Sequence, residues 1–273
     1  MALTDNLIAF YKLSDISDSS GNNRTLTNNG NVSFASGKIG NAAVFDAQSY
    51  LERNLSEINN DFSVSGWINP NSIGLYTACF GINQYDNGLL FRVGTGIDQL
   101  YVFGSYVTVG EFNANTWTHV VIAGSSGTAK AYVNGVMTTS LSYDSTMSFG
   151  ATPNFIAGAS RHNLSQEPLD GQIDAVGIWN RALSDAEVAE LYNNGTGLEL
   201  DPPNYRGEWD NFTDYGQDDV VSVNGVYWKL TGLGGWTVGG APGLGYGWTL
   251  LGVTPYSVRI SGNAKLQGKV KFA

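Results

Sequence analysis

Tryptophan is the residue type whose chemistry stands out first in this sequence. Four of the seven tryptophans lie in the last quarter of the chain, at Trp209, Trp228, Trp236 and Trp248. Sugar rings present C–H faces that pack flat on aromatic rings, and an indole adds one N–H donor. Trp236 is a candidate for such a contact because the glycines around it should expose its ring. The alternative is that the aromatic residues of so short a segment form its core.

Catalytic chemistry has little support in the sequence. There is no Gly-x-Ser-x-Gly, no His-Glu-x-x-His and no Walker loop. The adjacent Asp218 and Asp219 would face opposite sides of a strand, so they cannot work as a carboxylate pair. His119 lies in a strand pattern and is expected to be packed and hydrogen-bonded, whereas His162 is expected in a solvated loop. We therefore expect a protein that is not an enzyme.

Three further residues could touch a sugar, although no motif positions them: Tyr76, Tyr85 and Arg92. The lone cysteine, Cys79, lies in an apolar run and is expected in the core. A single cysteine excludes an intramolecular disulfide framework and a cysteine-cluster zinc site.

The charge balance excludes two classes of partner. The net charge is −10, with 24 acidic and 14 basic residues, whereas nucleic acids and anionic membranes need a basic surface. The charge is also uneven, because no acidic residue follows Asp219. The first residues lack a basic n-region, and no apolar stretch is long enough to span a bilayer. Neither a signal peptide nor membrane insertion is expected.

Short apolar or alternating runs between turn residues dominate the first 198 residues, and each is expected to be a strand. The runs are Leu7–Leu13, Phe62–Ile68, Leu89–Val93, Leu100–Val109, Trp117–Ile122, Lys130–Val133, Val136–Thr139, Phe155–Ala159 and Ile173–Trp179. Asn134-Gly135 between two of these runs predicts a type I′ hairpin. Because no helices alternate with the strands, the pattern predicts an all-β fold, an antiparallel two-sheet sandwich.

One helix is expected after the last of these strands. Ser184 and Glu187 fit a capping box, and Val188, Leu191 and Tyr192 form an apolar stripe at helical spacing. The Asn-Asn-Gly run at 193–195 is typical of a helix end.

The chain divides into four parts. Residues 1–198 form the sandwich, and the proline-containing stretch 199–204 is an extended linker. Residues 205–252 form a small β module, and residues 253–273 form a C-terminal β tail with a basic face.

The first part resembles the laminin-G-like, concanavalin A-like jelly-roll family. The segments that carry the likeness are Leu7–Asn22, Gly40–Asp46, Trp117–Val120 with Tyr132–Gly135, and Gly171–Ser184. The Asn-Arg-Ala-Leu-Ser run that leads into the helix, residues 180–184, is the most specific of them. The resemblance implies a two-sheet jelly roll.

The same resemblance implies a structural calcium ion. By position, Asp18 supplies a carboxylate, Ser20 and Asn23 supply oxygens, and Asp174 is a second carboxylate, which suits the oxygen ligands that calcium takes. The alternative for Asp18 is that it caps a turn through its own side chain. The alternative for Asp174 is a salt bridge to Arg181.

Residues 205–252 resemble the small carbohydrate-binding modules of families five and twelve, the chitin-binding type, most closely the copies in phage tail fibres. The matching residues are Tyr205–Asp210, Tyr215, Asp219–Ser222, Asn224–Trp228, Ala241-Pro242 and Gly247–Leu251. The resemblance implies a sugar platform made by Trp209, Tyr227 or Trp228, and Trp248. The glycine-rich loop 233–240 departs from the usual short polar loop of the family.

Together these features predict a non-catalytic, glycan-binding adhesion protein, a tail or head fibre of a phage virion, at the virion surface or outside the cell. Its expected partners are a polysaccharide, other virion proteins and further copies of itself, as a trimer. The alternative functions are a structural virion protein that binds no sugar, and a non-catalytic fragment of a secreted polysaccharide-degrading protein.

Overall fold

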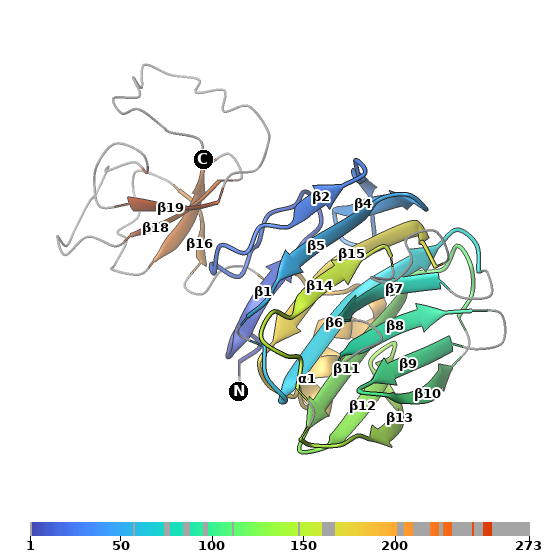
Figure 1. Ribbon diagram of the computed structural model, residues 1–273. Coiled ribbons are helices and arrows are strands. Elements are labelled where there is room, and N and C mark those ends of the chain that lie inside the picture. Colours follow the sequence, from blue (N-terminus) through green and yellow to red (C-terminus); the bar gives the residue numbers. More distant parts are fainter. Residues whose placement is uncertain are drawn as a thin grey trace. The chain divides into compact units, whose positions relative to one another are not determined.

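The computed structural model divides the chain into two compact units, residues 1–200 and 201–273, which we call unit 1 and unit 2 (Figure 1). The boundary falls within the stretch expected as a linker. The residues that the structure describes are 2–56, 58–73, 77–83, 88–94, 98–110, 112–146, 148–159, 167–200, 205–209, 219–223, 226–230, 242 and 248–252. The expected C-terminal β tail lies outside these residues.

Unit 1 is a sandwich of two antiparallel sheets, as the sequence predicts. One sheet has eight strands in the order β13-β12-β11-β6-β15-β4-β3, with β1 also paired to β15. Its strands are β1 (Leu7–Tyr11), β3 (Ser33–Ser36), β4 (Asn41–Asp46), β6 (Phe62–Pro70), β11 (Thr118–Ser125), β12 (Thr128–Val133), β13 (Val136–Ser142) and β15 (Asp170–Trp179).

The second sheet has seven strands in the order β10-β9-β8-β7-β14-β5-β2. These strands are β2 (Thr27–Asn29), β5 (Tyr50–Asn54), β7 (Thr77–Ile82), β8 (Leu89–Val93), β9 (Asp98–Val102), β10 (Ser105–Gly110) and β14 (Asn154–Ala157). In Figure 1 this sheet faces the viewer.

The main hydrophobic core lies between the sheets. Phe62, Phe80, Phe91 and Phe155 are fully buried there, and burial of each such side chain stabilises the fold by about 1.5–3 kcal/mol. Cys79 belongs to the same core, which confirms its expected burial.

Two tight turns join neighbouring strands, and the sequence predicted one of them. Asn134 and Gly135 have φ values of 50° and 78°, so the predicted type I′ hairpin is present between β12 and β13. The single strand expected over Leu100–Val109 is wrong, because Phe103 and Gly104, with φ values of 43° and 88°, form a second such turn between β9 and β10.

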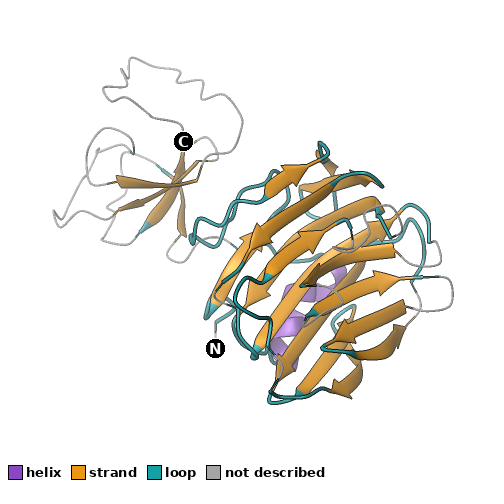
Figure 2. Ribbon diagram, in the orientation of Figure 1, coloured by secondary structure: helices purple, strands orange, loops and turns teal. Residues whose placement is uncertain are grey.

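The helix α1 (Asp185–Tyr192) covers the outer face of the eight-stranded sheet, behind both sheets in Figure 2. Both hydrogen bonds of the predicted capping box between Ser184 and Glu187 are present, and Asn193 ends the helix in the left-handed conformation. Val188 and Leu191 pack in a second apolar cluster with Trp67 and Trp179. A short 3-10 turn, Asn193–Gly195, follows the helix.

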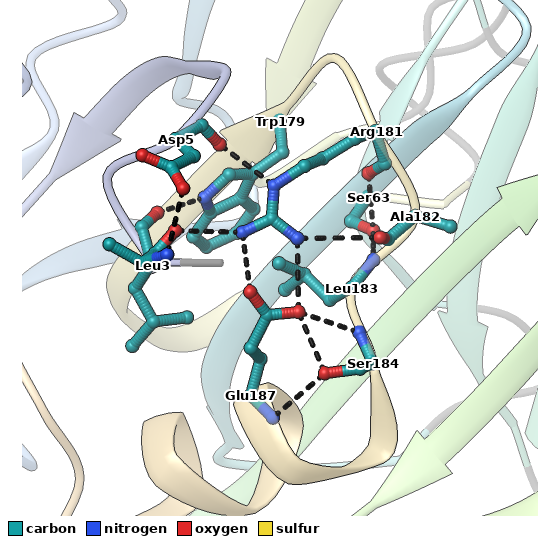
Figure 3. A network of polar contacts seen from close by, with 10 residues as sticks. Leu3, Asp5, Ser63, Trp179, Arg181, Ala182, Leu183, Ser184 and Glu187 are labelled. Atoms are coloured by element: carbon teal, nitrogen blue, oxygen red, sulfur yellow. Dashed lines mark hydrogen bonds and ion pairs between the residues drawn. The ribbon is translucent and has the colours of Figure 1, made fainter.

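A buried ion pair connects the start of α1 to the beginning of the chain (Figure 3). The guanidinium of Arg181 donates two hydrogen bonds to the Glu187 carboxylate, at 2.7 and 3.0 Å. It also donates to the backbone carbonyls of Ala2 and Asp5, at 3.0 and 2.8 Å. The Trp179 indole donates to the Leu3 carbonyl at 2.6 Å. The residues carrying the most specific family motif therefore hold the first residues against the end of β15.

Unit 2 contains a small four-stranded sheet in the order β16-β17-β18-β19. Its strands are β16 (Tyr205–Glu208), β17 (Val220–Val223), β18 (Val226–Leu230) and β19 (Trp248–Gly252). β16 and β17 are parallel, and the other pairs are antiparallel.

Candidate functional site

The loop expected to bind calcium is built around a buried Asp18 carboxylate. One oxygen accepts hydrogen bonds from the backbone N–H groups of Phe10 and Ser20, at 3.1 and 2.8 Å, and the other accepts from Arg24, at 2.9 Å. The Ser20 hydroxyl donates to the Ile8 carbonyl at 3.3 Å. Calcium needs oxygen ligands, whereas the groups aimed at this carboxylate are N–H donors. The contacts of Asp18 and Ser20 therefore fit the turn-capping alternative and do not fit the ion.

Asn23 and Asp174, the other two residues of the expected calcium site, do not complete a set of ligands around Asp18. Asn23 is exposed in the left-handed conformation, and Asp174 accepts hydrogen bonds from the backbone of a different loop, at Lys38 and Ile39. Within the described residues no group of three or more His, Cys, Asp or Glu side chains could hold a metal ion.

Melting experiments test whether the calcium ion implied by the family resemblance binds. Because both oxygens of Asp18 already accept backbone hydrogen bonds, we expect excess EDTA to leave the melting temperature of the full chain unchanged. Titration with calcium chloride should likewise leave it unchanged. A clear fall with EDTA that calcium reverses would restore the calcium site, since an ion bound only to the folded chain stabilises it.

Asp174 is a buried carboxyl on β15. One of its oxygens accepts both backbone N–H groups, from Lys38 and Ile39, at 2.8 Å each, and the other has no hydrogen-bond partner in the described structure. Burial raises the pKa of the Asp174 carboxyl to about 7, although the backbone hydrogen bonds oppose the rise. The salt bridge with Arg181 considered as an alternative is wrong, because Arg181 pairs with Glu187 instead.

His119 is packed and hydrogen-bonded, as expected. Its ring lies 5.0 Å from the Trp67 ring and 6.0 Å from the Tyr192 ring, and its Nε2 lies 3.0 Å from the Ser65 hydroxyl. Burial lowers the pKa of His119 to about 3, so the imidazole is neutral at physiological pH. This environment suits a core residue rather than an acid–base catalyst. His162 lies outside the described residues.

The aromatic residues expected to bind sugar in unit 2 are described only in part. Trp209 and Trp228 are half-buried and pack against Val221. The indole Nε1 of Trp209 is buried without a hydrogen-bond partner in the described structure. The packing against Val221 favours a core role for these two residues. Tyr227 and Trp248 lie in β18 and β19, but their side chains, like Trp236, are outside the described part.

A different group of side chains lies on the outer face of the seven-stranded sheet. The register places Leu90 opposite Tyr101, and Tyr101 opposite Tyr106, across β8, β9 and β10. Leu90 and Tyr101 are absent from the main core and form a small cluster of their own with Ala78. Their neighbours in β8 and β9, such as Phe91 and Leu100, point into the main core.

We call the group formed by Arg92, Tyr101, Tyr106 and Glu167 the outer-face cluster. Tyr106 is 49% exposed, and its ring centroid lies 4.7 Å from that of Tyr101. The Arg92 guanidinium carbon lies 5.2 Å from the Tyr106 centroid, and its Nη1 lies 3.5 Å from a Glu167 oxygen. A half-exposed aromatic ring is thus held between a buried arginine and a second ring.

The outer-face cluster combines aromatic rings, a guanidinium and one carboxylate. A tyrosine ring offers an apolar face, and a guanidinium offers several planar donors. Glycoside hydrolysis needs two carboxyl groups on either side of the bond, and Glu167 is the one acid among these four residues. Arg92, named from the sequence without positional support, lies beside Tyr106, and its contact with a sugar stays a prediction. Tyr106 was missed. Tyr76 and Tyr85 lie outside the described residues.

The comparisons with known proteins identify the family. Residues 45–189, more than half of the chain, match the concanavalin A-like lectin/glucanases superfamily. The chain belongs to this superfamily, which confirms the first resemblance drawn from the sequence. No curated protein sequence matches the chain. No helix in the described part is long and apolar enough to cross a membrane.

Three solved structures share the fold. Domain 4 of AbnA, an extracellular arabinanase from Geobacillus stearothermophilus solved with arabinotriose, is 27% identical with a TM-score of 0.59, over 67% of this chain and 97% of that domain. The binding domain of Paraclostridial Mosquitocidal Protein 1 is 22% identical with a TM-score of 0.56, over 71% and 53%. The binding domain of botulinum neurotoxin DC, in complex with SialylT, is 15% identical with a TM-score of 0.56, over 70% and 52%. The last two show the fold alone.

Proposed function

We propose that unit 1 is a non-catalytic glycan-binding domain and that the outer-face cluster contacts the sugar. The observation that carries this proposal is the half-exposed Tyr106 ring, which lies beside the buried Tyr101 and Arg92. The similarity to an arabinanase domain solved with arabinotriose supports it.

The geometry suggests how a sugar binds. The C–H face of one ring lies on Tyr106, where contact removes apolar surface from water. The Arg92 guanidinium donates to sugar hydroxyls while Glu167 holds its orientation, so little side-chain entropy is lost on binding. Because Arg92 and Tyr101 are already buried, the site is preformed.

We extend the proposal to the whole chain as an adhesion protein, a tail or head fibre at the surface of a phage virion. The resemblance of residues 205–252 to modules of tail fibres supports this role, as does the acid-free, tryptophan-rich end of the sequence. In this role other virion proteins hold the chain, which assembles as a homotrimer. Size-exclusion chromatography with light scattering tests the assembly.

A glycan array with wild-type protein and Tyr106→Ala tests the site. We expect the wild type to bind a defined set of glycans and Tyr106→Ala to bind them about tenfold or more weakly, as for loss of a central aromatic contact. Met137→Ala is the matched control, because Met137 is 46% exposed on β13, and its binding should be unchanged. Trp248→Ala on the same array reports whether unit 2 contributes.

The array also separates the alternatives. Equal binding by wild type and Tyr106→Ala would contradict the outer-face site. Absence of binding to every glycan would favour a structural virion role, or a fragment of a polysaccharide-degrading protein whose own specificity lies elsewhere.

A further inference from the structure

A cavity of about 500 Å³ lies at one end of the unit 1 sandwich, and none of its described lining residues belongs to the outer-face cluster. The segment between β5 and β6, the β11–β12 turn and the loop between β13 and β14 meet there. Its volume is within the range of roughly 300–1,000 Å³ that small-molecule sites occupy. The lining residues are Ile58, Asn59, Asn60, Asp61, Ser126, Gly127, Ser145, Ser148, Phe149 and Gly150. We call this cavity the loop-end pocket.

The apolar side of the pocket is anchored in the main core. Ile58 and Phe149 are buried there, and the Phe149 ring packs edge-on against Phe62 with centroids 5.2 Å apart. Phe149 also lies 4.9 Å from the Phe103 ring. This side of the pocket is therefore held by the same packing that holds the two sheets together.

Hydrogen bonds between the loops fix the polar side. The Asn59 side-chain oxygen accepts from the Asp61 backbone N–H at 2.9 Å, which sets the turn between them. The Asn60 side-chain amide donates to the Ser145 carbonyl at 3.4 Å, and the Tyr143 hydroxyl donates to the Asn60 carbonyl at 3.2 Å. These contacts join the two loops across the pocket.

The polar side keeps both donors and acceptors available. The side-chain Nδ2 of Asn59, the Asp61 carboxylate and the Ser148 hydroxyl have no hydrogen-bond partner among the described residues, and all three residues are exposed. The carboxylate only accepts, the amide nitrogen only donates, and the hydroxyl does both. A ligand that satisfies this set must itself carry donors and acceptors, as vicinal hydroxyl groups do.

We propose that the loop-end pocket is a second binding site of unit 1, for a single neutral sugar unit. Two ring hydroxyls donate to the Asp61 carboxylate, and a third oxygen accepts from the Asn59 amide. The sugar's C–H edge faces Ile58 and Phe149. Asp61, the one charged residue among the described lining residues, disfavours anions, and no described cluster of acids would hold a metal cation there. This proposal stands independently of the outer-face site.

Nitrogen-15 NMR of the full chain tests the pocket with four separate probes: glucose, galactose, arabinose and arabinotriose. We expect at least one of them to shift the amide signals of residues 59–61, 126–127 and 148–150. Asp61→Asn should weaken that probe about tenfold, as expected for loss of a hydrogen bond to a charged group. Glu190→Gln, the same change at an exposed position of α1, should leave binding unchanged.

Two outcomes overturn the proposal. One is that none of the four probes shifts these signals, and the other is that Asp61→Asn binds as tightly as wild type. Tyr106→Ala separates the two sites, because it should leave the pocket signals responsive. Shifts confined to the amides around Arg92 and Tyr106 would reject the loop-end pocket while supporting the outer-face site.

Discussion

Replacing Arg181 with alanine should destabilise unit 1 by about 3–5 kcal/mol, the range for breaking a buried ion pair from one side. Arg181 and Glu187 are 6% and 7% exposed, so the variant leaves a buried carboxylate without its cation. The backbone carbonyls of Ala2 and Asp5 lose their donor at the same time. A loss of this size should lower the melting temperature by about 6–20 °C.

The exposed pair of Lys130 and Asp185 supplies the control. Its nitrogen–oxygen distance is 3.2 Å, against 2.7 Å in the buried pair, and its side chains are 45% and 71% exposed. Lys130→Ala should therefore cost under about 1 kcal/mol. Equal melting temperatures for Arg181→Ala and Lys130→Ala would show that the buried pair contributes no special stability.

Because of the pKa of Glu187, the stability difference between wild type and Arg181→Ala should depend on pH. Burial alone would raise this pKa, but the hydrogen bonds from Arg181 and Ser184 outweigh it and lower the pKa to about 2. A carboxyl whose pKa is lower in the folded chain stabilises the fold at pH values above its unfolded pKa. This stabilisation is lost as the pH falls toward the folded pKa. The stability gap between wild type and Arg181→Ala should therefore narrow from pH 5 toward pH 2.

Asp174→Asn should make unit 1 more stable at pH 8 and give no gain at pH 4. The folded pKa of Asp174, about 7, lies above its ordinary value of 3.8. The wild type therefore keeps its full stability below the unfolded pKa of 3.8. As the pH rises through the folded pKa of about 7, it loses about 4 kcal/mol in total. Asparagine removes this pH-dependent loss, because it keeps an acceptor for Lys38 and Ile39 and carries no charge.

The asparagine also destabilises unit 1 to some extent at every pH. Its Nδ2 would occupy the buried position where one Asp174 oxygen has no described partner, at about 1–3 kcal/mol. The measured quantity is the difference in urea midpoint between variant and wild type at several pH values from 4 to 8. His119, whose lowered pKa costs stability as the pH falls below 6.5, is present in both chains and cancels. A difference that does not change with pH would contradict a raised pKa at Asp174.

Local signals predicted much of the fold. The Asn134-Gly135 turn and the Ser184 capping box each depend on a few adjacent residues, and both are present. The turn at Phe103-Gly104 was missed because a bulky phenylalanine in the left-handed region lies inside an apolar run. Its ring packs in the main core, where packing overrides the local preference against that conformation.

The candidate site depends on information that local spacing does not carry. Arg92 and Tyr106 meet because β8, β9 and β10 are paired in one register, and Glu167 arrives from a segment far along the chain. The partner of Arg181 was misjudged for a related reason. Asp174 lies nearby in sequence, but the strand directs it toward Lys38 and Ile39, while the capping residue Glu187 takes a second role as counter-ion.

The cluster beneath α1 contains both Leu3, near the beginning of unit 1, and Leu200, its last residue. Arg181 and Trp179 fasten the beginning of the chain to that place through Ala2, Leu3 and Asp5. Both ends of unit 1 therefore lie against the same apolar cluster. Domains whose ends lie near one another tolerate insertion into another protein and circular permutation, because no long connection across the surface is needed.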